Sequence, residues 1–214
     1  MSEIKLPSHY ERPLQDELRE SIELWHEQVA GLLPTLPSEV EIEFDDDYLV
    51  PGFGTGGAAS GLNAMKLAYN PNFSKTHDEL IAELRATYFH ESYHLARGFS
   101  FETTPYDLPA IIHALEEGLA TKFEVVRADS KPGYEQYEDR ETMLAWLEEV
   151  RSLPDGFDYD WERWKFFDPA TERKWVLYKV GVFLVDGALC NNPGLTIEGL
   201  STLAADEVIA LSKL

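Results

Sequence analysis

The chain has 214 residues, of which 39 are Asp or Glu and 18 are Lys or Arg, so its formal net charge is −21. An acidic surface repels the phosphates of nucleic acids and anionic membranes, so we expect no partner of either kind. With 44 % hydrophobic and 12 % aromatic residues, the composition is that of a folded globular chain.

No apolar run approaches the ~20 residues that a membrane span needs. The first residues lack the charged-then-apolar pattern of a secretory signal, so we expect a cytoplasmic protein without a membrane partner.

Hydrophobic periodicity and chain breakers predict a mostly helical chain with a few strands. In chain order, the predicted elements are a helix over residues 14–33, strands over 40–44 and 62–69 with an extended segment over 48–51 between them, and helices over 77–98, 109–128, 138–151, 171–190 and 203–211. Residues 154–168, rich in Asp and aromatic side chains, are predicted to be a loop.

The expected fold class is therefore α+β, with a small sheet beside the helix over residues 77–98. We expect one domain over residues 1–214, because this length can bury a substantial core. Residues 1–36 would form a helical brace for the sheet, and residues 191–214 a helical extension.

Residues 52–61 are dense in glycine, which is a feature of phosphate-binding loops. However, no Lys-Ser or Lys-Thr pair follows at P-loop spacing, and the segment precedes a predicted strand instead of a helix. We therefore predict a mobile hairpin or a bulged edge strand. Asp45, Asp46 and Asp47 resemble part of a calcium loop, but the later ligands are missing, so a turn is predicted.

The most informative motif is H-E-x-x-H at residues 90–94, inside the helix predicted over residues 77–98. Residues four apart lie on the same face of a helix. The imidazoles of His90 and His94 can therefore bind one zinc ion, and Glu91 can reach a water on that ion. We expect all three side chains to border a cleft.

A catalytic zinc site needs a third protein ligand. The helix predicted over residues 109–128 offers Glu116 and Glu117, and periodicity alone does not choose between them. The expected apolar stripe of this helix is Ile111, Ile112, Leu115, Leu119, Phe123 and Val126.

Gly118, in the middle of that helix, costs about 1 kcal/mol relative to Ala. This cost indicates that another backbone approaches closely there, and we expect it to be the H-E-x-x-H helix.

H-E-x-x-H followed some twenty residues later by a helical Glu resembles the gluzincin metallopeptidases. More narrowly, the chain is similar over roughly residues 40–190 to uncharacterised bacterial proteins described as predicted zinc-dependent proteases. The residues that carry this resemblance are His90, Glu91, His94, Arg97, the stretch Glu117-Gly118-Leu119-Ala120 and, more loosely, Tyr178-Lys179-Val180-Gly181.

The resemblance implies a zincin-like fold, with Glu117 as the third zinc ligand and a peptide or protein as the substrate. In such folds an edge strand above the metal commonly pairs with an extended peptide. One departure is Thr121, because many gluzincins have an acidic residue there that orients a zinc-bound His.

The expected activity is hydrolysis of peptide bonds, with Zn²⁺ as cofactor and Glu91 as the general base. The resemblance also suggests Tyr178 as a donor to the oxyanion, since gluzincins often use a Tyr or His from a later helix. The alternative for Tyr178 is a core aromatic residue beside Trp175 and Phe183. For His113, one turn before Glu117, a surface or capping role is favoured over one near the metal.

Two other functions fit the same motifs. The chain could keep a zincin framework only to bind metal or peptide, as a non-catalytic regulatory protein. It could also hydrolyse a non-peptide amide, since the same chemistry serves any polarised carbonyl.

Overall fold

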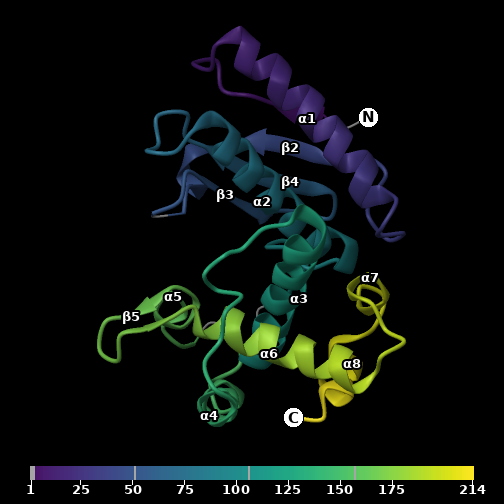
Figure 1. Ribbon diagram of the computed structural model, residues 1–214, viewed down its shortest axis with the longest axis vertical. Helices are drawn as coiled ribbons and strands as arrows, with labels where there is room; N and C mark the ends of the chain where they lie inside the picture. Colours follow the sequence, from purple (N-terminus) through teal and green to yellow (C-terminus); the bar gives the residue numbers. More distant parts are fainter. Residues whose placement is uncertain (1–2, 51, 106, 157) are drawn as a thin grey trace. The chain divides into compact units, whose positions relative to one another are not determined.

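The computed structural model describes residues 3–50, 52–105, 107–156 and 158–214. The fold is α+β, mostly helical with a small mixed sheet, as predicted. The chain divides into two compact units, Met1–Thr103 with Val126–Ser130, and Thr104–Val125 with Lys131–Leu214 (Figure 1). Among the described residues, no helix is both long enough and apolar enough to cross a membrane.

The first unit contains the mixed sheet, whose strand order is β1-β2-β4-β3. Its elements are β1 (Glu3–Lys5), α1 (Arg12–Ala30), β2 (Glu41–Phe44), the 3₁₀ helix η1 (Asp46–Tyr48), β3 (Thr55–Ala59), β4 (Ala64–Tyr69) and α2 (His77–Arg97). β1, β2 and β4 are parallel, and β3 runs antiparallel to β4 at the edge. β2 alternates as predicted, with Ile42 and Phe44 buried and Glu41 and Glu43 exposed.

Helix α2 packs against β3 and β4 on one side and contacts α1 on another (Figure 1). The Trp25 ring of α1 lies 5.9 Å from the Tyr88 ring of α2. The bounds of α2 have clear local causes. Thr76 and Glu79 form a capping box at its start, and Gly98 ends it in the left-handed conformation at φ 69°.

The extended segment predicted over residues 48–51 is present only in part. Residues 46–48 form η1, whereas Leu49 is extended, at φ −61° and ψ 124°, without being part of a strand; Pro51 lies outside the described residues. The side chain of Asp45 accepts a hydrogen bond from the backbone N–H of Asp47 and caps this turn. The predicted turn at the three aspartates is thus confirmed, and its capping explains why the chain curls there instead of extending.

Thr55–Ala59 of the glycine-dense segment forms edge strand β3, as predicted, but its residues pair one for one with those of β4, without the predicted bulge. Because successive residues of a strand face opposite sides, Gly56 and Gly57 meet different neighbours. A Cβ on Gly56 would lie 2.0 Å from the Tyr48 carbonyl oxygen. One on Gly57 would lie 2.8 Å from Cγ2 of Thr87 and 3.1 Å from Cγ of Glu91. The glycines therefore let η1 and α2 approach this strand closely.

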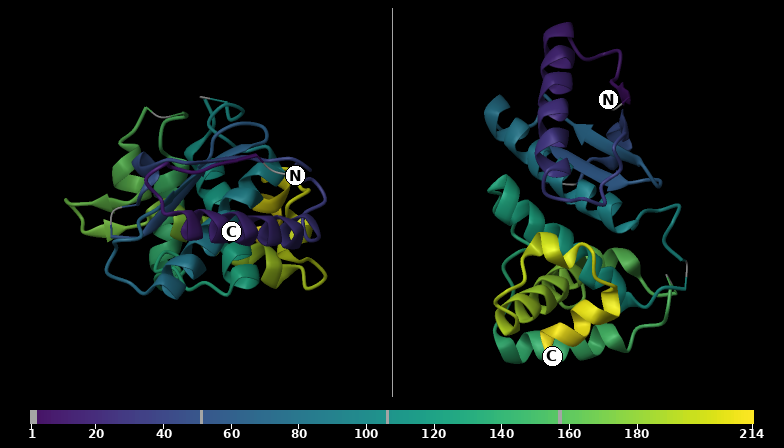
Figure 2. Two further views of the ribbon diagram at one scale, coloured as in Figure 1. Left: turned by 90° about the horizontal axis from the view of Figure 1, so that it is seen from above. Right: turned by 90° about the vertical axis from the view of Figure 1, so that its right-hand side faces the viewer.

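The second unit is helical apart from a two-stranded hairpin. Its elements are α3 (Ala110–Ala128, whose last residues belong to the first unit), α4 (Arg140–Arg151), α5 (Trp161–Lys165), β5 (Phe167–Asp168), β6 (Arg173–Lys174), α6 (Val176–Asn191), α7 (Ile197–Leu200) and α8 (Ala205–Ser212). Helices α6 and α8 lie side by side (Figure 2).

Two predictions in this unit were wrong. The predicted loop over residues 154–168 contains α5 and β5, and the helix predicted to begin at residue 171 begins at Val176. The residues before Val176 form β6 and end in Trp175, which adopts φ 60°. A left-handed residue cannot continue a helix, so α6 starts after it. A third prediction was wrong in the part of α3 that belongs to the first unit, where Val126 is exposed and does not belong to the apolar stripe.

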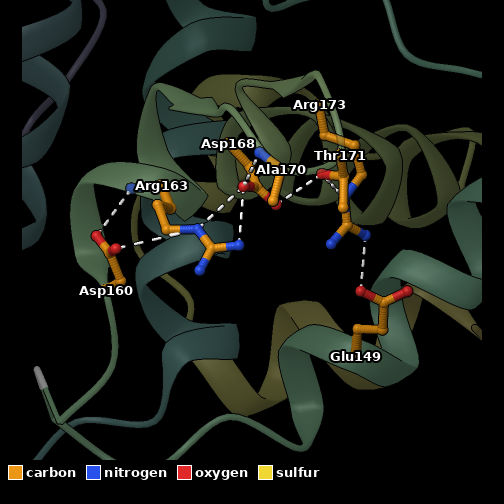
Figure 3. Close-up of polar contacts among 7 residues, drawn as sticks. All are labelled: Glu149, Asp160, Arg163, Asp168, Ala170, Thr171 and Arg173. Carbon is orange, nitrogen blue, oxygen red and sulfur yellow. Dashed lines mark hydrogen bonds and ion pairs between the residues drawn. The ribbon is translucent and has the colours of Figure 1, made fainter.

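Asp168 closes the β5–β6 hairpin (Figure 3). Its carboxylate accepts hydrogen bonds from the Thr171 hydroxyl at 2.6 Å, the Ala170 backbone N–H at 2.9 Å and Nε of Arg163 at 3.0 Å. These donors, the Thr171 hydroxyl foremost, lower the pKa of Asp168 to about 2. The hairpin is thus tied to α5 through Arg163.

Gly118 and Gly181 mark the crossing of α3 and α6. A Cβ on Gly118 would lie 2.0 Å from the backbone carbon of Gly181, and one on Gly181 would lie 1.8 Å from the Ala114 carbonyl oxygen. The close approach predicted at Gly118 is present, but the neighbouring backbone is that of α6 and not of the H-E-x-x-H helix.

We predict that Gly118→Ala lowers the free energy of unfolding by about 1–3 kcal/mol, because its methyl group overlaps backbone that cannot rotate away. Chemical denaturation of the full chain measures this change. Gly199→Ala is the control, because a Cβ there meets only the Thr196 hydroxyl at 3.7 Å. A Gly118→Ala variant as stable as the control would contradict the close crossing.

We predict that Asp168→Asn lowers the melting temperature at neutral pH, because the amide cannot accept the same charge-assisted hydrogen bonds. The folded-state pKa of Asp168 is depressed, so the wild-type advantage is full above about pH 4 and is lost as the pH falls towards about 2. Melting curves of both proteins across this range test the sign. A difference that grows on acidification would be inconsistent with the depressed pKa.

Candidate metal centre

His90 and His94 lie one turn apart on α2, and both side chains are buried. Their Nε2 atoms are 3.2 Å apart. A tetrahedral zinc ion with Zn–N bonds of about 2.0–2.1 Å separates two nitrogen ligands by about 3.3 Å. The helix therefore presents the two imidazoles at the separation that a shared ion requires, as the motif predicted.

Glu91 lies between the two histidines in sequence and is also buried. Its Oε2 accepts a hydrogen bond of 2.7 Å from the backbone N–H of Ala59, at the end of edge strand β3. The Gly57 backbone, two residues earlier, lies against the Glu91 side chain. The strand thus fixes the orientation of the carboxylate, a contact that periodicity along α2 could not reveal.

Glu117 on α3 is 5 % exposed, and Nζ of Lys165 on α5 lies 2.7 Å from its Oε1. A carboxylate that is buried on folding needs such a partner, because an unpaired buried charge is strongly unfavourable. Lys165 was not among the predicted site residues. It lies in a helix of five residues, which is too short to give a periodic signal in the sequence.

His113, one turn before Glu117, was expected to have a surface or capping role, and the expected exposure was wrong because the side chain is buried. Its ring lies 5.4 Å from the Trp161 ring in an edge-on arrangement. Burial lowers the pKa of His113 to about 4, although the nearby Glu117 carboxylate acts in the opposite direction. The imidazole is therefore neutral at pH 7.

His90, His94 and Glu117 form a group that could hold a metal ion. Each offers one ligand atom, and these three atoms lie within 4.8 Å of one another. Two neutral imidazoles and one carboxylate are a donor set that zinc accepts. Glu116, the alternative that the sequence left open, is also buried but is not in the group.

Arg85, on α2 five residues before His90, holds the end of α3. Its guanidinium donates to the carbonyl oxygens of Ala128 at 2.9 Å and Arg127 at 3.0 Å. The last carbonyls of a helix lack partners within the helix, and a cationic donor there satisfies them and the helix dipole. This contact joins the carboxyl end of α3 to the H-E-x-x-H helix.

Tyr178, the predicted oxyanion donor, is buried on α6. Its ring centroid lies 4.7 Å from that of Tyr134 and 5.9 Å from that of Trp175. Nζ of Lys165 lies 5.5 Å from the same ring. Trp175 is thus a neighbour, as the packing alternative expected, and the residue also adjoins the lysine that binds Glu117. Its catalytic role stays a prediction.

Comparisons of the chain with models of protein families, with curated proteins and with solved structures found no match.

We predict that the purified protein contains about one zinc ion per chain and that His94→Ala loses it, because the remaining two ligands hold the ion weakly. Elemental analysis after dialysis measures the zinc content. His77→Ala, on the same helix but exposed and bonded to Glu17, should keep the metal. Equal zinc content in the wild type and His94→Ala would rule out this ligand.

Proposed function

We propose that this protein is a zinc-dependent peptidase in a zincin-like fold, with His90, His94 and Glu117 as the metal ligands. The observation that carries the proposal is the convergence of three ligand atoms within 4.8 Å, with Glu91 between the two histidines in sequence. When bound there, a zinc ion would supply Lewis acidity that activates water and polarises a carbonyl.

Glu91 would act as the general base and then as the general acid. Its carboxylate would take a proton from the attacking water and later deliver it to the departing amine. The hydrogen bond from Ala59 occupies Oε2 and orients the group, so Oε1 is the oxygen proposed to handle the proton. This hydrogen bond supports the proposal, because a general base must be held within reach of the proton that it abstracts.

Edge strand β3 is the proposed docking site for an extended peptide substrate. A peptide can add to the edge of a sheet through main-chain hydrogen bonds, and the hydrogen bond from Ala59 brings this edge next to Glu91. The carbonyls of Thr55 and Ala59 on this edge accept hydrogen bonds from Val50 and Phe101, so a docked peptide would have to displace these contacts. Tyr178 is the proposed donor to the oxyanion that forms on the attacked carbonyl.

We predict that Glu91→Gln keeps its zinc but loses about 10²–10⁴-fold in turnover, because the amide cannot accept the proton. Hydrolysis of a library of quenched fluorescent peptides, with zinc content measured in parallel, tests this. Glu83→Gln is the matched control, since Glu83 lies on the same helix and pairs with Lys75.

Two outcomes would overturn the peptidase proposal. Undiminished turnover by Glu91→Gln would remove the general base. A wild-type protein that binds zinc but cleaves no peptide would instead indicate the non-catalytic metal-binding alternative.

A further inference from the structure

Lys165 and the candidate metal would use the same carboxylate. The ammonium of Lys165 lies 2.7 Å from Oε1 of Glu117, and both side chains are largely withdrawn from water, at 19 % and 6 % exposed. Glu117 is also the only acidic member of the group that could hold a metal ion. The ammonium of Lys165 therefore contacts the one candidate metal ligand that carries a negative charge.

Aromatic rings surround this ammonium. Nζ of Lys165 lies 5.1 Å from the ring centroid of Trp161, 5.5 Å from that of Tyr178 and 5.8 Å from that of Phe166. Rings at these distances attract a cation through their π faces and keep water away from it. Water therefore screens the ion pair only weakly, and the Coulomb attraction between its two charges is strong.

The backbone that carries Lys165 is also fixed. Asp160 caps the start of α5 by accepting a hydrogen bond from the Arg163 backbone N–H. The backbone N–H of Trp175 donates to the Phe166 carbonyl at 3.0 Å and closes the hairpin behind the lysine. Asp168 ties the same hairpin to α5 through Arg163 (Figure 3). These hydrogen bonds of α5 and the hairpin therefore restrain the backbone that places Lys165 next to Glu117.

Lys165 could affect metal binding in two opposite ways, and removal of its charge distinguishes them. If Lys165 only orients Glu117 as a ligand, its removal weakens metal binding, as loss of such partners usually does by 10–100-fold. If instead the positive charge competes with the ion for one carboxylate, its removal strengthens binding. Two cations that share a poorly screened carboxylate repel each other, and this favours the second consequence.

We propose that Lys165 is the internal counter-ion of Glu117 and competes with the metal, so that it keeps the zinc affinity of the site below what two histidines and a glutamate would give. The inference rests on the proposed function for the identity of the ligands. It assigns Lys165 the regulation of metal occupancy, separately from any peptide hydrolysis.

The test measures zinc affinity by competition with a chromophoric chelator, with zinc chloride as the probe and the full chain as the protein. Lys165→Met removes the charge but keeps an apolar chain among the rings, and we expect it to bind zinc at least tenfold more tightly than the wild type. Lys165→Arg keeps the charge and should bind as the wild type does.

Lys179→Met is the matched control. Lys179 also lies 2.7 Å from a carboxylate, that of Glu138, and 5.9 Å from the Trp146 ring, but it does not contact Glu117. We expect its zinc affinity to stay within twofold of the wild type. In the presence of a strong chelator, Lys165→Met should melt at a lower temperature than the wild type, and zinc should raise its melting temperature by more.

The inference is overturned if Lys165→Met binds zinc with equal or weaker affinity, or if neither it nor the wild type binds zinc. If Lys165→Met does not fold, Lys165→Gln, which is neutral but keeps a donor, replaces it with the same expected gain. Tighter zinc binding by the variant without any peptide hydrolysis by the wild type would support this inference while the peptidase proposal fails.

Discussion

The burial of ionisable side chains on α2 and α3 is the most demanding constraint on this protein. His90, Glu91, His94 and Glu117 are all less than a tenth exposed. Charges and imidazoles in such a setting must be bonded or paired, or the chain would not fold around them. A backbone N–H of β3 donates a hydrogen bond to Glu91, and Lys165 forms an ion pair with Glu117.

This constraint explains why two short elements with weak sequence signals contribute to the candidate metal centre. Strand β3 is poor in large side chains, yet its Ala59 N–H is what orients Glu91. The α5 helix has only five residues, yet it supplies the cation beside Glu117. In both cases a backbone position, set by a turn or a hairpin, delivers the group that the buried carboxylate needs.

The sequence predicts the H-E-x-x-H helix well because its signals are local. A capping box at Thr76, unbroken periodicity and Gly98 define α2 within residues that neighbour each other. The two imidazoles then follow from helix geometry alone. By contrast, Gly118 shows only that some backbone comes close, and the sequence has no means of telling that it is α6.

Other features could not be predicted from local patterns for a similar reason. The choice between Glu116 and Glu117 could not be made from periodicity, because both side chains are buried. The hairpin around Asp168 was predicted to be a loop, since a few hydrogen bonds among residues 160–171 replace the long apolar pattern that marks a regular element. Lys165 was missed for a further reason, because its role depends on a contact with a residue 48 positions away.

The adjacent glycines of β3 have one more consequence. At Gly56 and Gly57 the strand is bounded by Tyr48 on one face and by Thr87 and Glu91 on the other, with no room for a methyl group. A deep mutational scan would therefore score both positions as intolerant, although neither has a side chain that could react. Intolerance there would reflect how closely η1 and α2 pack against the strand, and it should not be mistaken for a sign of chemistry at those two residues.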